Sequence, residues 1–339
     1  MKALVWKGSH GLSVEEVVKP QIGSDEALVQ VIYNGICGTD MTILKGGHPR
    51  AKPPLILGHE TVGHIVEMKS RHHKLQLGDR VAVRPLINCE TCLACRSSQS
   101  HACRNLRLPG VDFNGGCAEY LKVPISILHR IPRNAKDEEI ALVEPLAVAI
   151  HAVSRIHRSY KKSKILILGT GPIGVLIGLI LRYQGHRKVT ISDTSHFRLG
   201  IAKRIGLQLL DASNPDFNSN AQAFASPEGF DILFEASGSK SAALNLTDLL
   251  RVQGTATIVG VHSEPVPVNL TQTAFKELTL IGSRVYTAQD FEKAIRLAST
   301  NRLGLRKLVT HIISLQESPK GFDAMADKNS SLKVLIKCS

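Results

Sequence analysis

The chain has 339 residues, of which 21% are charged and 43% hydrophobic, and its formal net charge at pH 7 is +13. At roughly 150 residues per domain this length predicts about two domains, and the ordinary globular composition excludes a disordered or fibrous chain. Seven cysteines are few and odd in number, which disfavours a disulfide framework and favours a reducing compartment.

The first 125 residues predict strands separated by turns, because short runs rich in Val, Ile and Tyr are bounded by Gly or Pro. A helix with Pro145 inside it is predicted next. From Lys164 onward strands and helices alternate, which predicts right-handed crossovers and a parallel sheet. The predicted strands are Ala27–Tyr33, Thr61–Glu67, Asp79–Arg84, Cys117–Val123, Ile165–Leu168, Lys188–Asp193, Asp231–Glu235, Thr255–Gly260, Leu278–Ile281 and Leu332–Lys337. The predicted helices are Asp137–Arg158, Pro172–Gln184, His196–Ile205, Ser239–Leu250 and Asp290–Ala298.

Neither a signal peptide nor a membrane span is expected. The apolar run within Met1–Lys7 is too short for a signal peptide. Ile165–Leu181 carries no charge, but four glycines and Pro172 interrupt it, and a strand, a glycine turn and a buried helix explain it better than a spanning helix. We therefore expect a soluble, cytoplasmic protein without a membrane partner.

The basic charge, with a pI near 9.5, could indicate a nucleic-acid partner. Aromatic residues make up only 4% of the chain and do not interleave with the basic runs. These runs are therefore better explained as solvent-exposed charged surfaces than as a binding surface for single-stranded nucleic acid. No nucleic-acid partner is expected. The two runs are Lys69, Arg71, His72, His73 and Lys74, and Arg155, His157, Arg158, Lys161, Lys162 and Lys164.

A dinucleotide-binding fingerprint spans Gly169-Thr170-Gly171-Pro172-Ile173-Gly174, which follows an apolar strand and opens an apolar helix. Its glycines permit a tight turn, close approach of a pyrophosphate, and packing of helix on strand, while the helix N-terminus favours phosphate. Asp193, at the end of the next strand, is placed to accept hydrogen bonds from the adenosine ribose and would repel a 2′-phosphate. The sequence thus predicts NAD, with Arg198 placed to stack near the adenine.

Four closely spaced cysteines form a C-x2-C-x2-C-x7-C pattern, typical of a tetrahedral structural zinc site. Disulfides at this spacing would be strained, and the spacing before the last cysteine does not fit a bacterial ferredoxin cluster. A DNA-reading zinc finger would need a basic recognition helix, whereas the segment 106–116 predicts a loop. The predicted ligands are Cys89, Cys92, Cys95 and Cys103.

A second metal site is suggested by Cys37-Gly-Thr39-Asp40, which follows a predicted strand, and by Gly58-His59-Glu60, which opens another. Taken singly, Cys37 could be a small buried hydrophobe and His59 a satisfied core histidine. Together with Glu144-Pro145 they resemble the zinc-containing alcohol dehydrogenases of the medium-chain dehydrogenase/reductase superfamily, and within it the sorbitol (L-iditol), butanediol and threonine dehydrogenases.

This resemblance extends over essentially the whole chain. It also includes Gly78-Asp79-Arg80-Val81, Gly116-Cys117-Ala118-Glu119-Tyr120, the cysteine quartet and the nucleotide fingerprint. It implies an α/β fold, in which residues 1–148 with 288–339 form a GroES-like β-rich catalytic domain and residues 149–287 a Rossmann domain. A dimer or tetramer is usual in such a family.

The resemblance also implies the roles of individual residues. A catalytic zinc would be held by Cys37, His59 and Glu60, with Glu144 as an exchangeable ligand. Asp40 would orient His59, and Thr39 would relay the alcohol proton toward the nicotinamide ribose, although a turn-stabilising role is the simpler alternative for its hydroxyl. Zinc would lower the pKa of the bound alcohol, and hydride would pass to NAD. The segments approaching the nicotinamide would be Gly260-Val261-His262 and Ser283-Arg284, although Arg284 could instead be a solvated surface arginine.

The substrate is less defined. Glu144-Pro145 favours polyol dehydrogenases, whereas Met1-Lys2-Ala3-Leu4 and the segment 320–325 are similar to threonine enzymes, and Ile43 stands where some polyol enzymes have an aromatic contact. We expect oxidation of a secondary alcohol on a small polar substrate, such as a polyol, sugar acid or diol, to a ketone. The alternatives are an activity of the L-threonine 3-dehydrogenase type and a non-catalytic binding protein on the same fold.

One departure from the family pattern generates a prediction. Many relatives carry a histidine five positions after the cysteine ligand, where it passes the proton to solvent, and Thr42 stands there in this chain. We expect a shallower dependence of turnover on pH around neutrality than a histidine-gated relay gives. A rate profile measured from pH 5.5 to 8.5 tests this, and a sharp single-proton step at about pH 6.5 would contradict it.

Overall fold

The computed structural model describes residues 1–69, 74–156, 162–225 and 228–339. Parts of the two basic runs, residues 70–73 and 157–161, lie outside the described residues. The chain divides into two compact units, Met1–Glu144 with Thr287–Ser339 and Pro145–Tyr286. No helix among the described residues is long and apolar enough to cross a membrane.

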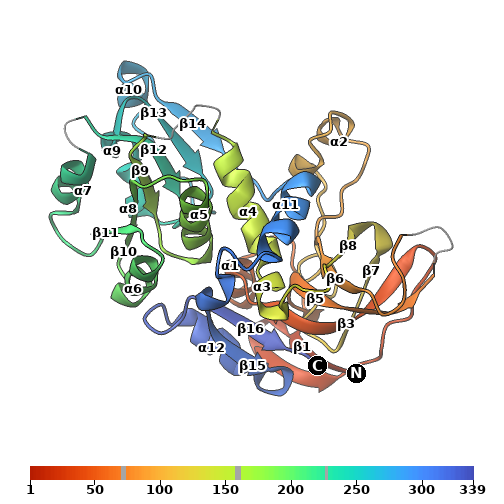
Figure 1. Ribbon diagram of the computed structural model, residues 1–339. Coiled ribbons are helices and arrows are strands. Elements are labelled where there is room, and N and C mark those ends of the chain that lie inside the picture. Colours follow the sequence, from red (N-terminus) through yellow and green to blue (C-terminus); the bar gives the residue numbers. More distant parts are fainter. Residues whose placement is uncertain (70–73, 157–161, 226–227) are drawn as a thin grey trace. The chain divides into compact units, whose positions relative to one another are not determined.

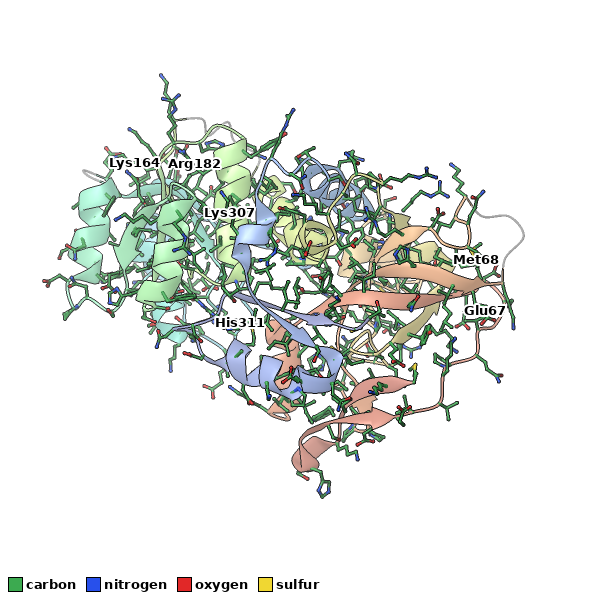
Figure 2. The ribbon with its side chains drawn as sticks, turned by 60° about the horizontal axis from the view of Figure 1, so that its bottom comes forward. Glu67, Met68, Lys164, Arg182, Lys307 and His311 are labelled. Atoms are coloured by element: carbon green, nitrogen blue, oxygen red, sulfur yellow. The ribbon has the colours of Figure 1, made fainter. Side chains whose placement is uncertain are left out.

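The first unit is built on a seven-stranded sheet in which the C-terminal strand lies beside a strand from the N-terminal part of the chain (Figure 1). The order is β15-β16-β3-β5-β6-β8, with β7 also paired to β3, and all pairs but β15–β16 are antiparallel. These strands are β3 (Glu26–Gly35), β5 (Glu60–Met68), β6 (Arg80–Val83), β7 (Tyr120–Pro124), β8 (Leu128–Arg130), β15 (Val309–Ser314) and β16 (Lys333–Lys337). His311 marks β15 in Figure 2, and Glu67 and Met68 mark the end of β5.

A smaller antiparallel sheet and five helices complete the first unit. The sheet has the order β2-β1-β4, formed by β1 (Lys2–Trp6), β2 (Leu12–Glu16) and β4 (Leu55–Ile56). The helices are α1 (Gly38–Leu44), α2 (Leu93–Arg96), α3 (Asp137–Ile140), α11 (Ala288–Ala298) and α12 (Ser318–Ala326). Alternate residues of β3, among them Val29 and Val31, point into one apolar core together with Ile65 of β5 and Phe322 of α12.

The C-terminal segment is tied to the earlier part of the first unit by a buried carboxylate. Glu139 of α3 accepts hydrogen bonds from the backbone N–H groups of Leu305 (2.8 Å) and Arg306 (3.1 Å), at the start of a 3-10 helix over Leu305–Leu308. Unpaired N–H groups at a helix start favour a negative partner, so this contact holds two segments far apart in the sequence together.

The second unit is a six-stranded parallel sheet with strand order β11-β10-β9-β12-β13-β14. Numbered from its first strand this is the order 3-2-1-4-5-6 of a doubly wound dinucleotide-binding fold. Its strands are β9 (Ile165–Leu168), β10 (Val189–Asp193), β11 (Gln208–Asp211), β12 (Phe230–Glu235), β13 (Leu250–Ile258) and β14 (Thr279–Gly282). The predicted fold class, a β-rich part with a doubly wound parallel sheet, is confirmed.

Helices pack against both faces of this sheet because its strands are apolar on both sides. Leu166 and Leu168 of β9 face a cluster formed with α7 and α9, while Ile167, between them, approaches α5 at Gly174. The helices of this unit are α4 (Val143–Ser154, beginning at the last two residues of the first unit), α5 (Pro172–Tyr183), α6 (His196–Arg204), α7 (Phe217–Ala225), α8 (Lys240–Leu244), α9 (Leu246–Leu249) and α10 (Leu270–Phe275). Figure 2 labels Lys164, just before β9, and Arg182 near the end of α5.

Two single helices predicted from the sequence are each divided in the structure. The predicted helix 137–158 is interrupted at Ala141 and Leu142, so that α3 ends and α4 begins, and Pro145 lies in the first turn of α4, where a missing N–H costs no helical bond. The predicted helix 239–250 is likewise divided into α8 and α9, and β13 begins at Leu250, five residues earlier than predicted.

Candidate functional site

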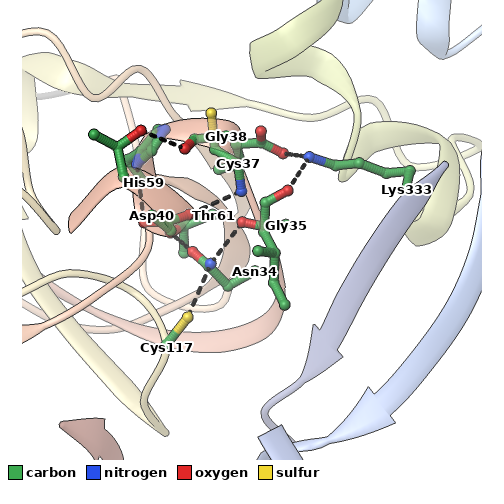
Figure 3. A network of polar contacts seen from close by, with 12 residues as sticks. Asn34, Gly35, Cys37, Gly38, Asp40, His59, Thr61, Cys117 and Lys333 are labelled. Atoms are coloured by element: carbon green, nitrogen blue, oxygen red, sulfur yellow. Dashed lines mark hydrogen bonds and ion pairs between the residues drawn. The ribbon is translucent and has the colours of Figure 1, made fainter. Parts of the chain in front are cut away.

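Three potential metal ligands converge in the first unit where two neighbouring strands meet. Cys37 lies between the end of β3 and α1, and His59 and Glu60 lie at the start of β5. Gly35 of β3 pairs directly with Glu60, so the antiparallel register places the cysteine beside the other two residues (Figure 3). One donor atom from each of the three lies within 4.8 Å of the others. A thiolate, an imidazole and a carboxylate form a donor set that suits zinc, and an open fourth position is typical of catalytic sites.

Asp40 acts on this cluster through the backbone and through its charge. Its Oδ2 accepts a hydrogen bond from the backbone N–H of Cys37 at 2.8 Å, which closes the first turn of α1 around the cysteine. Its Oδ1 lies 3.7 Å from Nδ1 of His59, a charge contact beyond ordinary hydrogen-bond length. With Nδ1 turned toward Asp40, Nε2 is the imidazole nitrogen left for a metal.

The charge around His59 calls for a cation. Complete burial of this side chain would by itself lower its pKa, but the negative charges of Asp40, Cys37 and Glu144 outweigh burial and raise the pKa of His59 well above its usual value. The residues present therefore fit a divalent metal, since a cysteine, a histidine and a glutamate donor converge beside the buried carboxylate of Asp40.

Glu144 and Thr39, two further predicted residues, lie near this cluster without belonging to the group of three. Glu144 is close enough to influence the pKa of His59, but its oxygens are not within 4.8 Å of all three donors. Thr39 is half-buried in the first turn of α1. The Thr42 hydroxyl donates to the carbonyl of Gly38 at 3.1 Å, within its own helix.

His48, in the loop after α1, has its Nδ1 directed inward. Nδ1 accepts from the backbone N–H groups of Arg50 and Ala51, both at 3.3 Å. Burial, followed by the charge of Arg50, lowers the pKa of His48.

The four remaining predicted metal ligands form a separate cluster around α2. Neighbouring sulfur atoms lie 3.5 Å apart for Cys92–Cys95 and Cys89–Cys103, 3.9 Å for Cys92–Cys103 and 4.0 Å for Cys89–Cys95. These separations exclude disulfides and match the edge of about 3.8 Å expected for a tetrahedron with Zn–S bonds of about 2.3 Å. Hydrogen bonds from the Thr91 hydroxyl and from backbone N–H groups lower the pKa of Cys89 to about 5, which favours the thiolate that zinc binds.

A polar network behind the open cluster was not predicted from the sequence (Figure 3). The Asn34 amide donates to the carbonyl of Gly35 at 2.9 Å and to Sγ of Cys117 at 3.2 Å, and Asn34 Oδ1 accepts from the Thr61 hydroxyl at 2.7 Å. Burial raises the pKa of Cys117 well above its usual value, and this residue is not among the three whose donor atoms converge. Gly58, at φ +99° and with a would-be Cβ 2.4 Å from Asn34, lets the chain turn into His59.

Lys333 was also not predicted. This residue is 1% exposed, yet its Nζ forms an ion pair with Oε2 of Glu60 and donates to the carbonyl of Ile36 at 2.9 Å. Figure 3 shows the side chain of Lys333 reaching into this network near Gly35.

The predicted nucleotide-binding residues lie at the carboxyl ends of the parallel strands, the edge where doubly wound sheets bind ligands. Gly169 has φ +101°, and a Cβ there would lie 2.8 Å from Ser237; a Cβ at Gly174 would lie 1.9 Å from the carbonyl oxygen of Gly169. Gly171, by contrast, has open space around a would-be Cβ. The first and third glycines are thus required by the fold, and the second leaves a cradle that fits a pyrophosphate at the start of α5.

Asp193 ends β10 beside this turn. Its carboxylate accepts from the backbone N–H groups of Thr170 (2.7 Å) and Ser195 (2.9 Å), so it is held at the mouth of the glycine turn. Arg198 is buried in α6, which the side chain of Ser195 caps.

The other predicted cofactor segments follow β13 and β14. His262 forms an ion pair with Glu235 at the end of β12, with Nε2 and Oε2 3.2 Å apart, which ties the loop after β13 to the loop after β12. Gly260 packs against the same carboxylate, and Val261 is exposed. Ser283 is partly buried and Arg284 is exposed.

Comparison with known proteins agrees with this geometry. Residues 23–133 match the family model described as "Alcohol dehydrogenase GroES-like domain", and residues 172–300 match "Zinc-binding dehydrogenase". The chain is 32% identical to a 2-dehydro-3-deoxy-L-galactonate 5-dehydrogenase of Pseudoalteromonas atlantica, over 100% of this chain and 99% of that protein. It is 31% identical to an L-threonine 3-dehydrogenase of Alteromonas mediterranea, over 99% of both chains. A structure from Sinorhizobium meliloti, bound to NADP, superposes with a TM-score of 0.91 at 32% identity, over 99% of this chain and 98% of that one.

The second glycine of the fingerprint provides a test of the cradle. A Gly171→Ala substitution adds a methyl group where the fold has room, so we expect an unchanged melting temperature but dinucleotide binding weakened by about tenfold or more, the effect of roughly 1–3 kcal/mol of steric overlap. Fluorescence titration with NADH and a thermal melt measure the two effects. Gly174→Ala is the control and should lower the melting temperature, and unaltered binding by Gly171→Ala would show that no phosphate approaches this position.

Proposed function

The chain belongs to the zinc-containing alcohol dehydrogenase family, and on that basis we propose that it oxidises a polyol, sugar acid or diol with NAD at the Cys37–His59–Glu60 cluster. The family predicted from the sequence is confirmed. The chain is an enzyme, a zinc-dependent dehydrogenase that uses a nicotinamide cofactor and acts on a secondary alcohol of a small polar substrate. The finer assignments of residues, cofactor and substrate are our proposal.

The observation that carries the proposal is the convergence of a cysteine, a histidine and a glutamate in one negatively charged, largely buried cluster. Zinc bound there would act as a Lewis acid on the substrate hydroxyl. Cys37, His59 and Glu60 would hold the zinc, and Glu144 is near enough to be an exchangeable ligand. Asp40 fixes the backbone of Cys37 and, by facing Nδ1 of His59, would leave Nε2 to bind the metal. Thr39 would take the proton of the substrate hydroxyl and pass it on.

A second zinc, bound by Cys89, Cys92, Cys95 and Cys103, would be structural. Its four sulfur atoms occupy all positions of a tetrahedron and leave none for substrate. We further propose that residues 1–148 with 288–339 and residues 149–287 are the two folding domains, near the division into two compact units. Thiolate ligands need reducing conditions, which supports a cytoplasmic location.

NAD is proposed over NADP because of Asp193. Its carboxylate is held beside the glycine turn, where a 2′-phosphate would meet a negative charge, and Thr194 and Ser195, the next two residues, supply no cation. The NADP in the Sinorhizobium meliloti structure makes a direct comparison of the two cofactors necessary.

The relatives support two classes of substrate. The name of one relative specifies a deoxy sugar acid and that of another L-threonine, and both substrates are small and polar. Glu144-Pro145 favours the polyol and sugar-acid side, and the L-threonine 3-dehydrogenase type of activity is the second candidate because relatives of that name match over the whole chain.

Turnover with a panel of substrates tests the proposal. We expect reduction of NAD, and much slower reduction of NADP, with one class among polyols, sugar acids, vicinal diols and L-threonine, followed by absorbance at the NADH wavelength. Cys37→Ala should abolish turnover and lower the zinc content from two ions to one per chain, because it removes a ligand of the open site only. Cys338→Ala, which removes a buried thiol outside both clusters, is the control. Full turnover by Cys37→Ala would contradict the assignment of the open site.

We also propose a homo-oligomer, a dimer or tetramer, in which the second unit contributes an interface. Among the described strands β14 pairs with β13 alone, so one edge is free to pair with another chain. Three large apolar side chains are exposed on β14 and on the preceding helix α10, namely Leu280 (37%), Leu270 (74%) and Phe275 (83%). A second copy related by a two-fold axis would cover the same edge on both chains.

Sedimentation analysis tests this interface. The wild-type chain should sediment as a dimer or tetramer. The double variant Phe275→Glu/Leu280→Lys should sediment as a smaller species, and its monomer should begin to melt at the same temperature as the wild-type chain. Val18→Lys, which alters a side chain 91% exposed in the first unit, should leave the assembly intact. A monomeric wild-type chain, or a double variant that assembles normally, would refute this arrangement.

A further inference from the structure

Two groups compete for the carboxylate of Glu60. It belongs to the three-residue metal cluster, and its Oε2 already forms an ion pair with Nζ of Lys333. Both side chains are almost fully buried, with 2% of Glu60 and 1% of Lys333 exposed. An ion pair this deep is kept only where the geometry is good, because each charge has lost its hydration.

The strands are arranged to let this pair form. Lys333 begins β16 and Glu60 begins β5, and β3 runs between these two strands in the sheet. The lysine side chain crosses β3 at Gly35, where a Cβ would lie 2.1 Å from Oε2 of Glu60 and 3.1 Å from Cε of Lys333. The missing side chain at this position makes room for the contact (Figure 3).

Lys333 is anchored on its other side as well. Its Nζ donates to the carbonyl of Ile36 at 2.9 Å, one residue before Cys37. The lysine therefore touches the backbone that leads into one ligand and the carboxylate of another. These two contacts fix the position of Lys333 relative to Cys37 and Glu60.

We propose that Lys333 is a positioning residue that holds one oxygen of Glu60 away from the metal and so makes Glu60 a second weak, exchangeable ligand of the zinc site, beside Glu144. This inference rests on the proposed function of the Cys37–His59–Glu60 cluster. The lysine cation opposes a second cation nearby and occupies a carboxylate oxygen, and both effects lower the affinity of the site for zinc. A ligand held in this way can leave when a substrate oxygen arrives, which a carboxylate free to bind through both oxygens does less readily.

Zinc affinity is the direct test. Protein stripped of the open-site zinc, with the four-cysteine site still loaded, is titrated with zinc in competition with a chromogenic chelator. Lys333→Met, close to lysine in length but uncharged, should bind zinc at the open site roughly 10- to 100-fold more tightly, the range over which partners of metal ligands typically act. Lys337→Met, at the exposed end of the same strand, is the matched control and should bind as wild type.

A double-mutant cycle separates an effect through Glu60 from a general loss of charge. In a Glu60→Gln background the further change Lys333→Met should leave zinc affinity unchanged within about threefold, since the carboxylate that the lysine holds is gone. Equal or weaker zinc binding by Lys333→Met, or a gain of the same size in the Glu60→Gln background, would overturn the proposal.

Two further measurements keep the test decisive if Lys333→Met does not fold without metal. The zinc-loaded variant should release open-site zinc to the chelator more slowly than wild type, and release at the wild-type rate would count against the proposal. Replacement of the open-site zinc by Co²⁺ should give visible absorption bands that shift in Lys333→Met and not in Lys337→Met. If wild type and Cys37→Ala contain the same amount of zinc, the open site itself is absent and the proposed function fails before this inference is reached.

Discussion

The pairing of β3 with β5 is the constraint on which the proposed metal site depends. Because Gly35 lies opposite Glu60, the residues just beyond one strand meet those at the start of the other, and Cys37 comes within reach of His59. A shift of one residue would turn Glu60 to the opposite face of the sheet. Alternate residues of β3, with Ile65 of β5, pack in the core beneath this pairing, so the packing of the core supports the geometry of the ligands.

Negative charge accumulated at this point has to be balanced by cations, and the structure does so on two sides. His59 carries a raised pKa because the charges of Asp40, Cys37 and Glu144 outweigh its burial, and a bound metal would take over that balancing. Lys333 balances Glu60 from the opposite direction. The proton or metal at His59 can be exchanged, whereas Lys333 is part of the chain. The charge that a bound metal would experience at this site therefore depends on both groups.

The sequence motifs predicted most of this site, because metal ligands and glycine turns are short-range patterns. Cys37 follows a strand, His59 and Glu60 open another, and Gly169 and Gly174 are required by close backbone contacts that the spacing of the fingerprint anticipates. The parallel arrangement of the second unit follows from the alternation of strands and helices together with the handedness of crossovers, whereas its strand order was not predicted. The strands β1, β2, β4, β8, β11 and β15 were not among the predicted ones. They are two to six residues long, and periodicity carries little signal in such short strands.

Lys333 could not have been found in this way. It stands 297 residues from Ile36, which its ammonium group contacts, and a lysine in a C-terminal strand reads as a solvent-exposed charge until β16 is seen beside β3. The local trace is Gly35, the glycine that ends β3, since a glycine in a strand commonly marks close approach of another group. Here that group is an ion pair crossing the strand, and a residue larger than glycine would separate Lys333 from Glu60 while leaving all three metal ligands in the sequence. The motif therefore specifies which atoms bind the metal, and the neighbouring strand determines how tightly one of them does so.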